Sequence, residues 1–416
     1  MKSVCQTPLP ATATGLRTQR VYPFVVHILL VGIFIVGWAE MSIVGILPNI
    51  ASSFGIHPTE LSVVISLYSV AFAIVGPVVL IGVRWMSPRF MLTLLMGVIA
   101  ASSLASALAD DAVTMSILRM VLAAASAAFA GTTMSVAVKL VSAEQSGGVL
   151  GYIAAGFGGA LVCGVPLSIM IADVGGWELA FQLIGAGGIL CALAIWTVWP
   201  GVSQVGTPPK SMQFSAIRAL KADHFIGQAG ILLWMLAYAI PFSFLPSILR
   251  GSLGYTASEL TIAMILFGCC CMAGAQVGGF VSDRLGELRT ITLAFVAHAA
   301  ILAAAPFLVT SFPGVLVTMM IWGGVSWMST PPLQALIAKT SKDISDLMLT
   351  VSNSVLHISI ALGAFVGAVL MAASLVTFFY VPVVILSVAI FVMWRHRTKL
   401  VPFDGAAIVE SEFKEE

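Results

Sequence analysis

Long apolar segments recur along the entire chain, and they constrain the fold more than any other feature of the sequence. Of the 416 residues, 59% are hydrophobic and only 9% are charged, and the mean hydropathy is +1.06. A chain with so few polar residues cannot cover a soluble globule. A helix needs about 20 apolar residues to cross a bilayer, and the short alternating segments typical of membrane β-barrels are absent from the sequence. The sequence therefore predicts an all-α, multi-pass membrane protein.

Twelve segments are long and apolar enough to be membrane-spanning helices. They cover residues 22–47, 60–83, 89–109, 112–140, 147–172, 178–199, 222–248, 259–282, 288–309, 314–338, 344–371 and 373–394. The longest polar connection follows the sixth segment and divides the chain into two six-helix halves. We expect a cytoplasmic N-terminal tail (1–21), a first half (22–199), a cytoplasmic linker (200–221), a second half (222–394) and a cytoplasmic C-terminal tail (395–416).

Two sequence landmarks occur in both halves at nearly the same spacing. The tripeptide TEL at 59–61 returns as SEL at 258–260, and Arg84 and Arg89 return as Arg284 and Arg289. We expect each tripeptide to start a helix with a hydroxyl N-cap. Internal duplication of helical halves is typical of alternating-access transporters, whereas a channel or a membrane enzyme does not need it.

The basic residues indicate which side of the membrane each connection occupies. Of the 19 Lys and Arg residues, all except Arg119 and Arg250 lie in the tails, at the C-terminus or at every second connection. Because cytoplasmic connections carry an excess of Lys and Arg, both termini are predicted to be cytoplasmic. The first 21 residues contain no short apolar run, so we expect no cleavable signal peptide and assign targeting to the first span.

Several kinds of chemistry lack their sequence motifs. The six Cys residues fit neither a disulfide framework nor a zinc site. The phosphate-binding glycine loop and the metalloprotease motif are also absent from the sequence. We therefore predict no enzymatic activity, no metal or other cofactor, and no nucleic-acid partner.

One acidic residue lies deep inside the first apolar segment. Glu40 interrupts the run GIFIVGWAEMSIVGILP, residues 32–48, and an ionisable group in the hydrocarbon costs at least about 2.5–3.5 kcal/mol on insertion scales. Arg119 is the one opposite charge that we place in the hydrocarbon, and counting along the two helices puts both residues roughly 12 Å below the outer surface. Burial favours the neutral carboxyl and a nearby guanidinium favours the charged one. We predict that Glu40 carries a proton and that Arg119 is its partner; a static buried ion pair is the alternative.

Five stretches of the chain resemble parts of a known family. GGFVSDRLGELR (278–289) resembles the loop motif G-x-x-x-D-R-x-G-R of the major facilitator superfamily, and the Gly/Pro-rich stretch 156–181 resembles the fifth-helix motif of its antiporters. Residues 37–51, 321–339 and 352–369 resemble helices 1, 10 and 11 of the drug:proton antiporter branch, which includes bacterial efflux transporters for purines, sugars and drugs. The first-half copy of the loop motif departs from the pattern at Val83 and Met86.

The resemblance implies a major facilitator fold and proton-coupled efflux by alternating access. In the family an acid on helix 1 and an Arg on helix 4 take part in coupling, which matches Glu40 and Arg119. For gating we expect a hinge at Gly164 and Pro166, and a clasp formed by Asp283, Arg284, Gly286 and Arg289. Ordinary helix packing and a solvated cluster of loop charges are the alternatives.

The substrate site is expected on inward faces near the middle of the membrane. The candidates are Trp38, Tyr68, Thr133, Trp234, Tyr238, Phe242, Trp322, Trp327, Gln334, Asn353 and His357. A few polar groups in an aromatic wall suit a flat, neutral or weakly charged organic molecule. Packing or lipid contact is the alternative for each aromatic residue, and His357 could instead be a second proton site.

These expectations combine into one hypothesis. We predict a monomeric exporter in the cytoplasmic (inner) membrane of a bacterium, with a small-molecule substrate, protons and membrane lipid as its partners. A proton symporter or facilitative importer is one alternative, and a non-transporting membrane sensor or scaffold is another. A purine, a sugar, a drug and a metabolite all remain open as substrates.

Overall fold

The computed structural model describes residues 23–76, 78–79, 86–141, 145–199, 224–371 and 374–400. Within these ranges the chain is helical. The helices are α1 (Pro23–Phe54), α2 (Ser62–Val70), the π-helix η1 (Ala71–Val75), α4 (Pro88–Ser106), α5 (Ala112–Ala137), α6 (Ser146–Gly175), α7 (Trp177–Val198), α9 (His224–Ser247), the π-helix η3 (Ile248–Ser252), α10 (Ala257–Leu285), α11 (Glu287–Leu308), α12 (Phe312–Trp327), α13 (Thr330–Thr340), the 3₁₀ helix η4 (Lys342–Ile344), α14 (Ser345–Met371), α15 (Leu375–Arg395) and α16 (Arg397–Leu400). The predicted N-terminal tail, the linker 200–221, Val83, Arg84 and residues beyond 400 lie outside the described residues.

The described helices have the length and the surface of membrane spans. Eleven stretches are long and apolar enough to cross a bilayer, and the shorter apolar helix Ser62–Val75 occupies the second position of the predicted twelve. Large apolar side chains cover the outside of the bundle; Phe307 is 71% exposed and Phe391 is 68% exposed. An apolar exterior of this kind is stable in lipid, so the fold is that of a multi-pass helical membrane protein.

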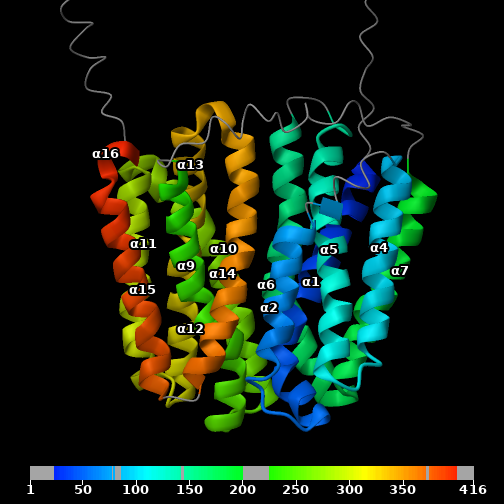
Figure 1. Cartoon of the computed structure of the whole chain (residues 1–416), viewed down its shortest axis with the longest axis horizontal. Coiled ribbons are helices and arrows are strands. Elements are labelled where there is room, and N and C mark those ends of the chain that lie inside the picture. The colour runs from blue at the N-terminus through cyan, green and yellow to red at the C-terminus, as the bar shows by residue number, and fades with distance from the viewer. Residues whose placement is uncertain are drawn as a thin grey trace, which may run out of the picture.

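The helices form two bundles that lie side by side (Figure 1). In the first, α1 packs along α6, and α4 packs against α5 and α7; in the second, α9 packs against α14 and α15, and α10 against α12. The bundles meet where α2 contacts α14 and where α6 contacts α10. Close approach at the second contact requires Gly268, because a Cβ at that position would lie 2.6 Å from the Cα of Val162.

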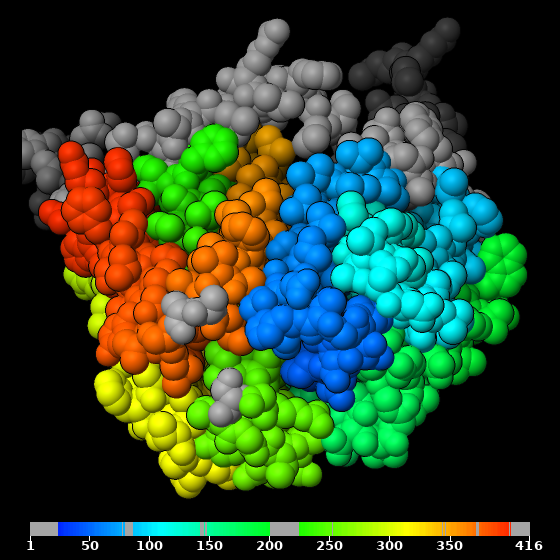
Figure 2. Space-filling view, turned by 60° about the horizontal axis from the view of Figure 1, so that its bottom comes forward, coloured from blue at the N-terminus to red at the C-terminus, as the bar shows by residue number. Residues whose placement is uncertain are grey.

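The two halves pack directly against each other at one end of the bundle. We call the end at which α1 and α9 begin the linker end; it is the upper end in Figure 1. At the opposite end, turned toward the viewer in Figure 2, the atoms of α2 pack directly against those of α14.

Two local predictions differ from the structure. The predicted span 314–338 is divided into α12 and α13, because Pro331 and Pro332 have no N–H to continue the helical hydrogen bonds. Ser258 is not an N-cap: the N-cap of α10 is Thr256, two residues earlier, which accepts a hydrogen bond from the N–H of Glu259 in a capping box. Likewise, Thr59 is not the N-cap of α2: the helix begins at Ser62, and the preceding residue, Leu61, makes no side-chain cap.

Candidate substrate cavity and proton site

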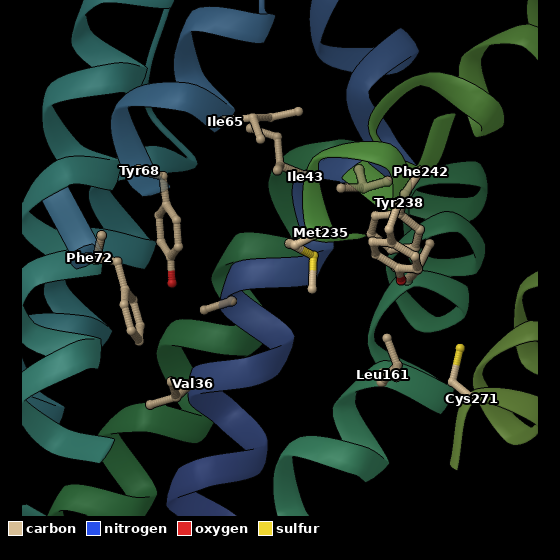
Figure 3. Close-up of a cluster of buried hydrophobic side chains, with 14 of the residues drawn as sticks. Val36, Ile43, Ile65, Tyr68, Phe72, Leu161, Met235, Tyr238, Phe242 and Cys271 are labelled. Atoms are coloured by element: carbon tan, nitrogen blue, oxygen red, sulfur yellow. The ribbon is translucent and has the colours of Figure 1, made fainter. Parts of the chain in front are cut away.

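A cavity of about 480 Å³ lies between the two halves, near the middle of the helices. Seven predicted substrate residues line it: Tyr68, Tyr238, Phe242, Trp327, Gln334, Asn353 and His357. Glu40 and Arg119 line the same cavity. Figure 3 shows Tyr68 and Phe72 on one side of this region and the rings of Tyr238 and Phe242 on the other. The cavity therefore brings most of the predicted binding residues together with the predicted proton site.

Glu40 presents its carboxyl group to the cavity from the middle of α1. The residue is only 8% exposed. Its Oε1 atom lies 3.8 Å from Nδ1 of His357, on α14 of the other half, and its Oε2 atom has no hydrogen-bond partner. A buried carboxylate with so few partners is costly, and taking up a proton is the usual way to remove that cost.

Arg119 lies level with Glu40, and it binds main-chain atoms. Its Nη1 donates to the carbonyl of Ala39 at 3.0 Å, and its Nη2 donates to the carbonyl of Glu40 at 3.2 Å. The guanidinium also lies 4.7 Å from the ring centre of Tyr68. Although both residues are among those the structure describes, the guanidinium and the Glu40 carboxylate form no ion pair in this conformation. Arg119 therefore ties α5 to α1 and leaves the carboxyl free.

His357 connects this site to the second half of the molecule. Its ring stacks on Phe72 of η1, with ring centres 3.8 Å apart and planes inclined by 22°. Two further hydrogen bonds cross the same seam: Ser354 Oγ donates to the carbonyl of Ala73, and Ser66 Oγ donates to the carbonyl of Ala361. The surroundings of Glu40 therefore depend on how α14 is placed against α2 and η1.

The second half supplies an aromatic wall. The rings of Tyr238 and Phe242 stack with centres 5.1 Å apart, and Trp327 meets Tyr238 edge-on at 6.2 Å. Trp234 lies behind this wall and lines a smaller recess. A flat ring system could stack against such a wall.

Three candidate residues line neither the cavity nor that recess: Trp38, Thr133 and Trp322. The indole N–H of Trp38 donates to Ser168 Oγ on α6 at 3.0 Å, and that of Trp322 donates to His298 Nε2 at 2.8 Å. Thr133 is fully buried within the first half. In this conformation all three pack between helices.

The predicted gating residues lie at helix contacts and at a turn. Gly164 allows close approach of α6 to α1, because a Cβ there would lie 3.3 Å from Cδ1 of Trp38, and Pro166 follows within α6. Gly286 has φ +81° at the start of α11, a conformation that favours glycine.

The charges beside that turn are arranged differently from the predicted clasp. Asp283 and Arg289 are exposed, and Arg284 lies over the ring of Phe280. The ion pair found here among the described residues joins Glu287 to Lys339 of α13.

An ion pair at the opposite end was not foreseen from the sequence. Arg250, in η3, contacts Asp173 Oδ1 on α6 at 3.0 Å and Asn49 Oδ1 on α1 at 3.5 Å. The contact joins the two halves at the end where they are already packed together. Its one sequence signal was that Arg250 lies outside the cytoplasmic pattern of basic residues.

A cavity between two six-helix halves that are closed together at one end is the arrangement of an alternating-access membrane transporter. A family model described as the Major Facilitator Superfamily matches residues 29–364. The chain belongs to this superfamily, and it is accordingly a transporter that works by alternating access, not an enzyme. Members of the superfamily generally need no cofactor, and the described residues contain no cluster of three or more His, Cys, Asp or Glu that could hold a metal ion.

Similar proteins span nearly the whole chain. "Uncharacterized MFS-type transporter YbcL" of Bacillus subtilis is 24% identical, covering 83% of this chain and 88% of the relative. "Inner membrane transport protein YdhP" of Escherichia coli is also 24% identical, covering 85% and 90%. A crystal structure of a bacterial homolog to the human lysosomal transporter Spinster, inward-facing and occupied, has a TM-score of 0.74 at 14% identity over 91% of this chain and 97% of that one. The structural likeness shows the fold alone.

Proposed function

We propose that this transporter exports a small organic compound in exchange for protons, as in the drug:proton antiporter branch. Glu40 is the proton carrier, and Arg119 positions it by fixing the α1 backbone at that level. The linker end is cytoplasmic, the membrane is the bacterial cytoplasmic membrane, and the protein works as a monomer.

The observation that carries the proposal is the state of the Glu40 carboxyl group. It lines the cavity, is nearly buried, and has one oxygen without a partner. His357, whose Nδ1 lies 3.8 Å from Oε1 of Glu40, belongs to the other half, so movement of the halves removes that neighbour. Proton uptake at Glu40 is thereby linked to the conformation of the transporter. Export as the direction follows from the resemblance and from the predicted orientation.

The test needs a transported compound and a proton gradient. Comparing the compounds excreted by cells with and without the protein identifies a substrate. In everted vesicles with an acidic interior, the wild type should then accumulate that compound, and collapsing the gradient should stop accumulation. Glu40→Gln should abolish the effect of the gradient, because an amide cannot release a proton, while substrate exchange without a gradient continues.

Glu60→Gln is the matched control, because Glu60 is an exposed carboxylate in the α1–α2 turn. Full gradient dependence in Glu40→Gln would show that the proton carrier is a different residue. Substrate loss from acid-loaded everted vesicles would instead indicate a proton symporter.

A further inference from the structure

A recess of about 70 Å³ extends from the main cavity into the second half, between α9, α13 and α14. Thr330, Gln334, Asn353 and Leu356 line both spaces, so the recess is a side pocket of the cavity. About 10–15 Å³ is enough for one water molecule, so the recess has room for a small functional group. We call it the amide recess, after its two carboxamide side chains, Gln334 and Asn353.

Trp234 lines the amide recess and carries an unpartnered donor. Its side chain is 1% exposed, and its Nε1 has no hydrogen-bond partner. An indole N–H can only donate, so only an acceptor can satisfy it. The hydroxyl of Thr330, which also lines the recess, has no partner either.

Ser352, which also lines the recess, has its hydrogen-bond partners within the fold. Gln228 Nε2 donates to the carbonyl of Met348 and to Ser352 Oγ, both at 2.9 Å, and Ser352 in turn donates to the carbonyl of Met348. Trp322 provides a comparison within the same half: it is equally buried, but its N–H is bound to His298. Trp322, which lines neither space, thus has a satisfied N–H, whereas the N–H of Trp234, which lines the recess, has no partner.

All polar side chains that line the amide recess are uncharged hydroxyl, amide or indole groups. A charged group placed there would lose its hydration without gaining a counter-ion, which is strongly unfavourable. The ionisable residues of the main cavity, Glu40 and Arg119, come from the first half, and His357 does not line the recess.

We infer that the amide recess binds an uncharged acceptor group of the transported compound, a carbonyl or a ring nitrogen, through the N–H of Trp234. The flat apolar body of the compound then lies against Tyr238 and Phe242. The inference deepens the proposed function, since it names the substrate class of the same cavity. It predicts a neutral, flat molecule with a small polar head.

The test measures binding of three probes that share one ring: benzamide, benzoate and benzylamine. Saturation-transfer NMR on the purified, detergent-solubilised transporter suits weak ligands of this size. Benzamide should bind the wild type more tightly than either charged probe. Trp234→Phe should weaken benzamide binding by about tenfold, the size expected for a lost hydrogen bond to a buried acceptor.

Trp322→Phe is the control, because it removes the same N–H from a residue that lines neither space. It should leave benzamide binding unchanged. Thr330→Val removes the other unpartnered group, a hydroxyl, and should also weaken benzamide binding. Melting curves identify any variant that fails to fold. Equal loss in both Trp variants, preference for a charged probe, or no benzamide binding to the wild type would overturn the inference. Binding to solubilised protein needs no proton gradient, so a failure of proton coupling in vesicles would remain a separate result.

Discussion

At the scale of single residues, Arg119 shows what the sequence could and could not predict. Counting residues from the helix ends predicts that Arg119 lies level with Glu40, because an α-helix rises a fixed distance per residue. The identity of its acceptors depends on the side-chain conformation and on which main-chain carbonyls are within reach. The guanidinium therefore meets Glu40 through the carbonyl, and the carboxyl approaches His357.

The fork geometry of Arg119 leads to a prediction about stability. Arg119→Lys keeps the charge, but an ammonium group cannot reproduce the two parallel donors that reach Ala39 and Glu40. We expect the variant to lose about 1.5–3 kcal/mol, the range for a hydrogen bond to a charged group. Denaturation of the purified protein measures the loss, and Arg395→Lys, at an exposed helix end, is the control. Equal stability of the two variants would mean that the fork contributes nothing.

At the scale of helices, the start of α5 can be tested in the same way. Asp111 caps this helix: its Oδ1 accepts from the N–H groups of Val113 and Thr114 at 2.8 and 2.9 Å. The Thr114 hydroxyl, followed by these N–H groups, holds the pKa of Asp111 below its ordinary value of 3.8. Because the pKa is lowered in the folded state, the stabilisation is present above that value and is lost as the pH falls below it.

We therefore expect Asp111→Ala to lower the melting temperature at neutral pH more than Asp110→Ala does. Asp110 is the adjacent exposed carboxylate outside the cap. The difference between the two variants should shrink when the melting curves are repeated below pH 3.8. A difference that does not change with pH would show that the charge of the cap has no part in it.

The sequence predicts where the helices lie better than it predicts where they break or change to π-helix. Apolar runs fix the spans within a few residues, since the bilayer sets their length. The division between α12 and α13 was also readable, at Pro331 and Pro332. The π-helices η1 and η3 had no comparable signal, because they lie where one half meets the other: Ala73 accepts from Ser354, and Arg250 reaches Asp173.

At the scale of the whole molecule, the sequence predicted the two halves, and most of the substrate residues that it predicted line the cavity. Tyr238, Asn353 and His357 were selected as polar or aromatic groups on inward faces, and they line it. The sequence could not exclude Trp38 or Trp322, because their orientation depends on partners that are distant in the chain. Nor could it reveal the amide recess, which is a space between three helices.

The contact of Arg250 with Asp173 predicts how the balance between conformations can be shifted. Both side chains are partly exposed, so the pair contributes at most about 1 kcal/mol. Arg250→Asp should therefore raise the population open at the opposite end by up to about fivefold. The exchanged pair Arg250→Asp with Asp173→Arg should restore the wild-type balance.

Distances between spin labels report this population. Labels at Ser53 on α1 and Thr310 after α11 lie on different halves at the opposite end, and both sites are exposed. The exposed Cys163 and Cys269 would first be replaced by alanine. An unchanged distance distribution in Arg250→Asp would show that the pair does not help to hold this end shut.

The serine bonds between α2, η1 and α14 have a consequence for the speed of transport. A serine in a helix can turn its hydroxyl to a carbonyl one turn back, as Ser359 does toward Val355 at 2.7 Å. When the halves part, Ser66 and Ser354 can rotate in this way, so neither hydroxyl is stranded in an apolar setting. Each hydroxyl can thus exchange its bond between the halves for a bond within its own helix. Separating α14 from α2 and η1 therefore adds little to the energy barrier of each transport cycle.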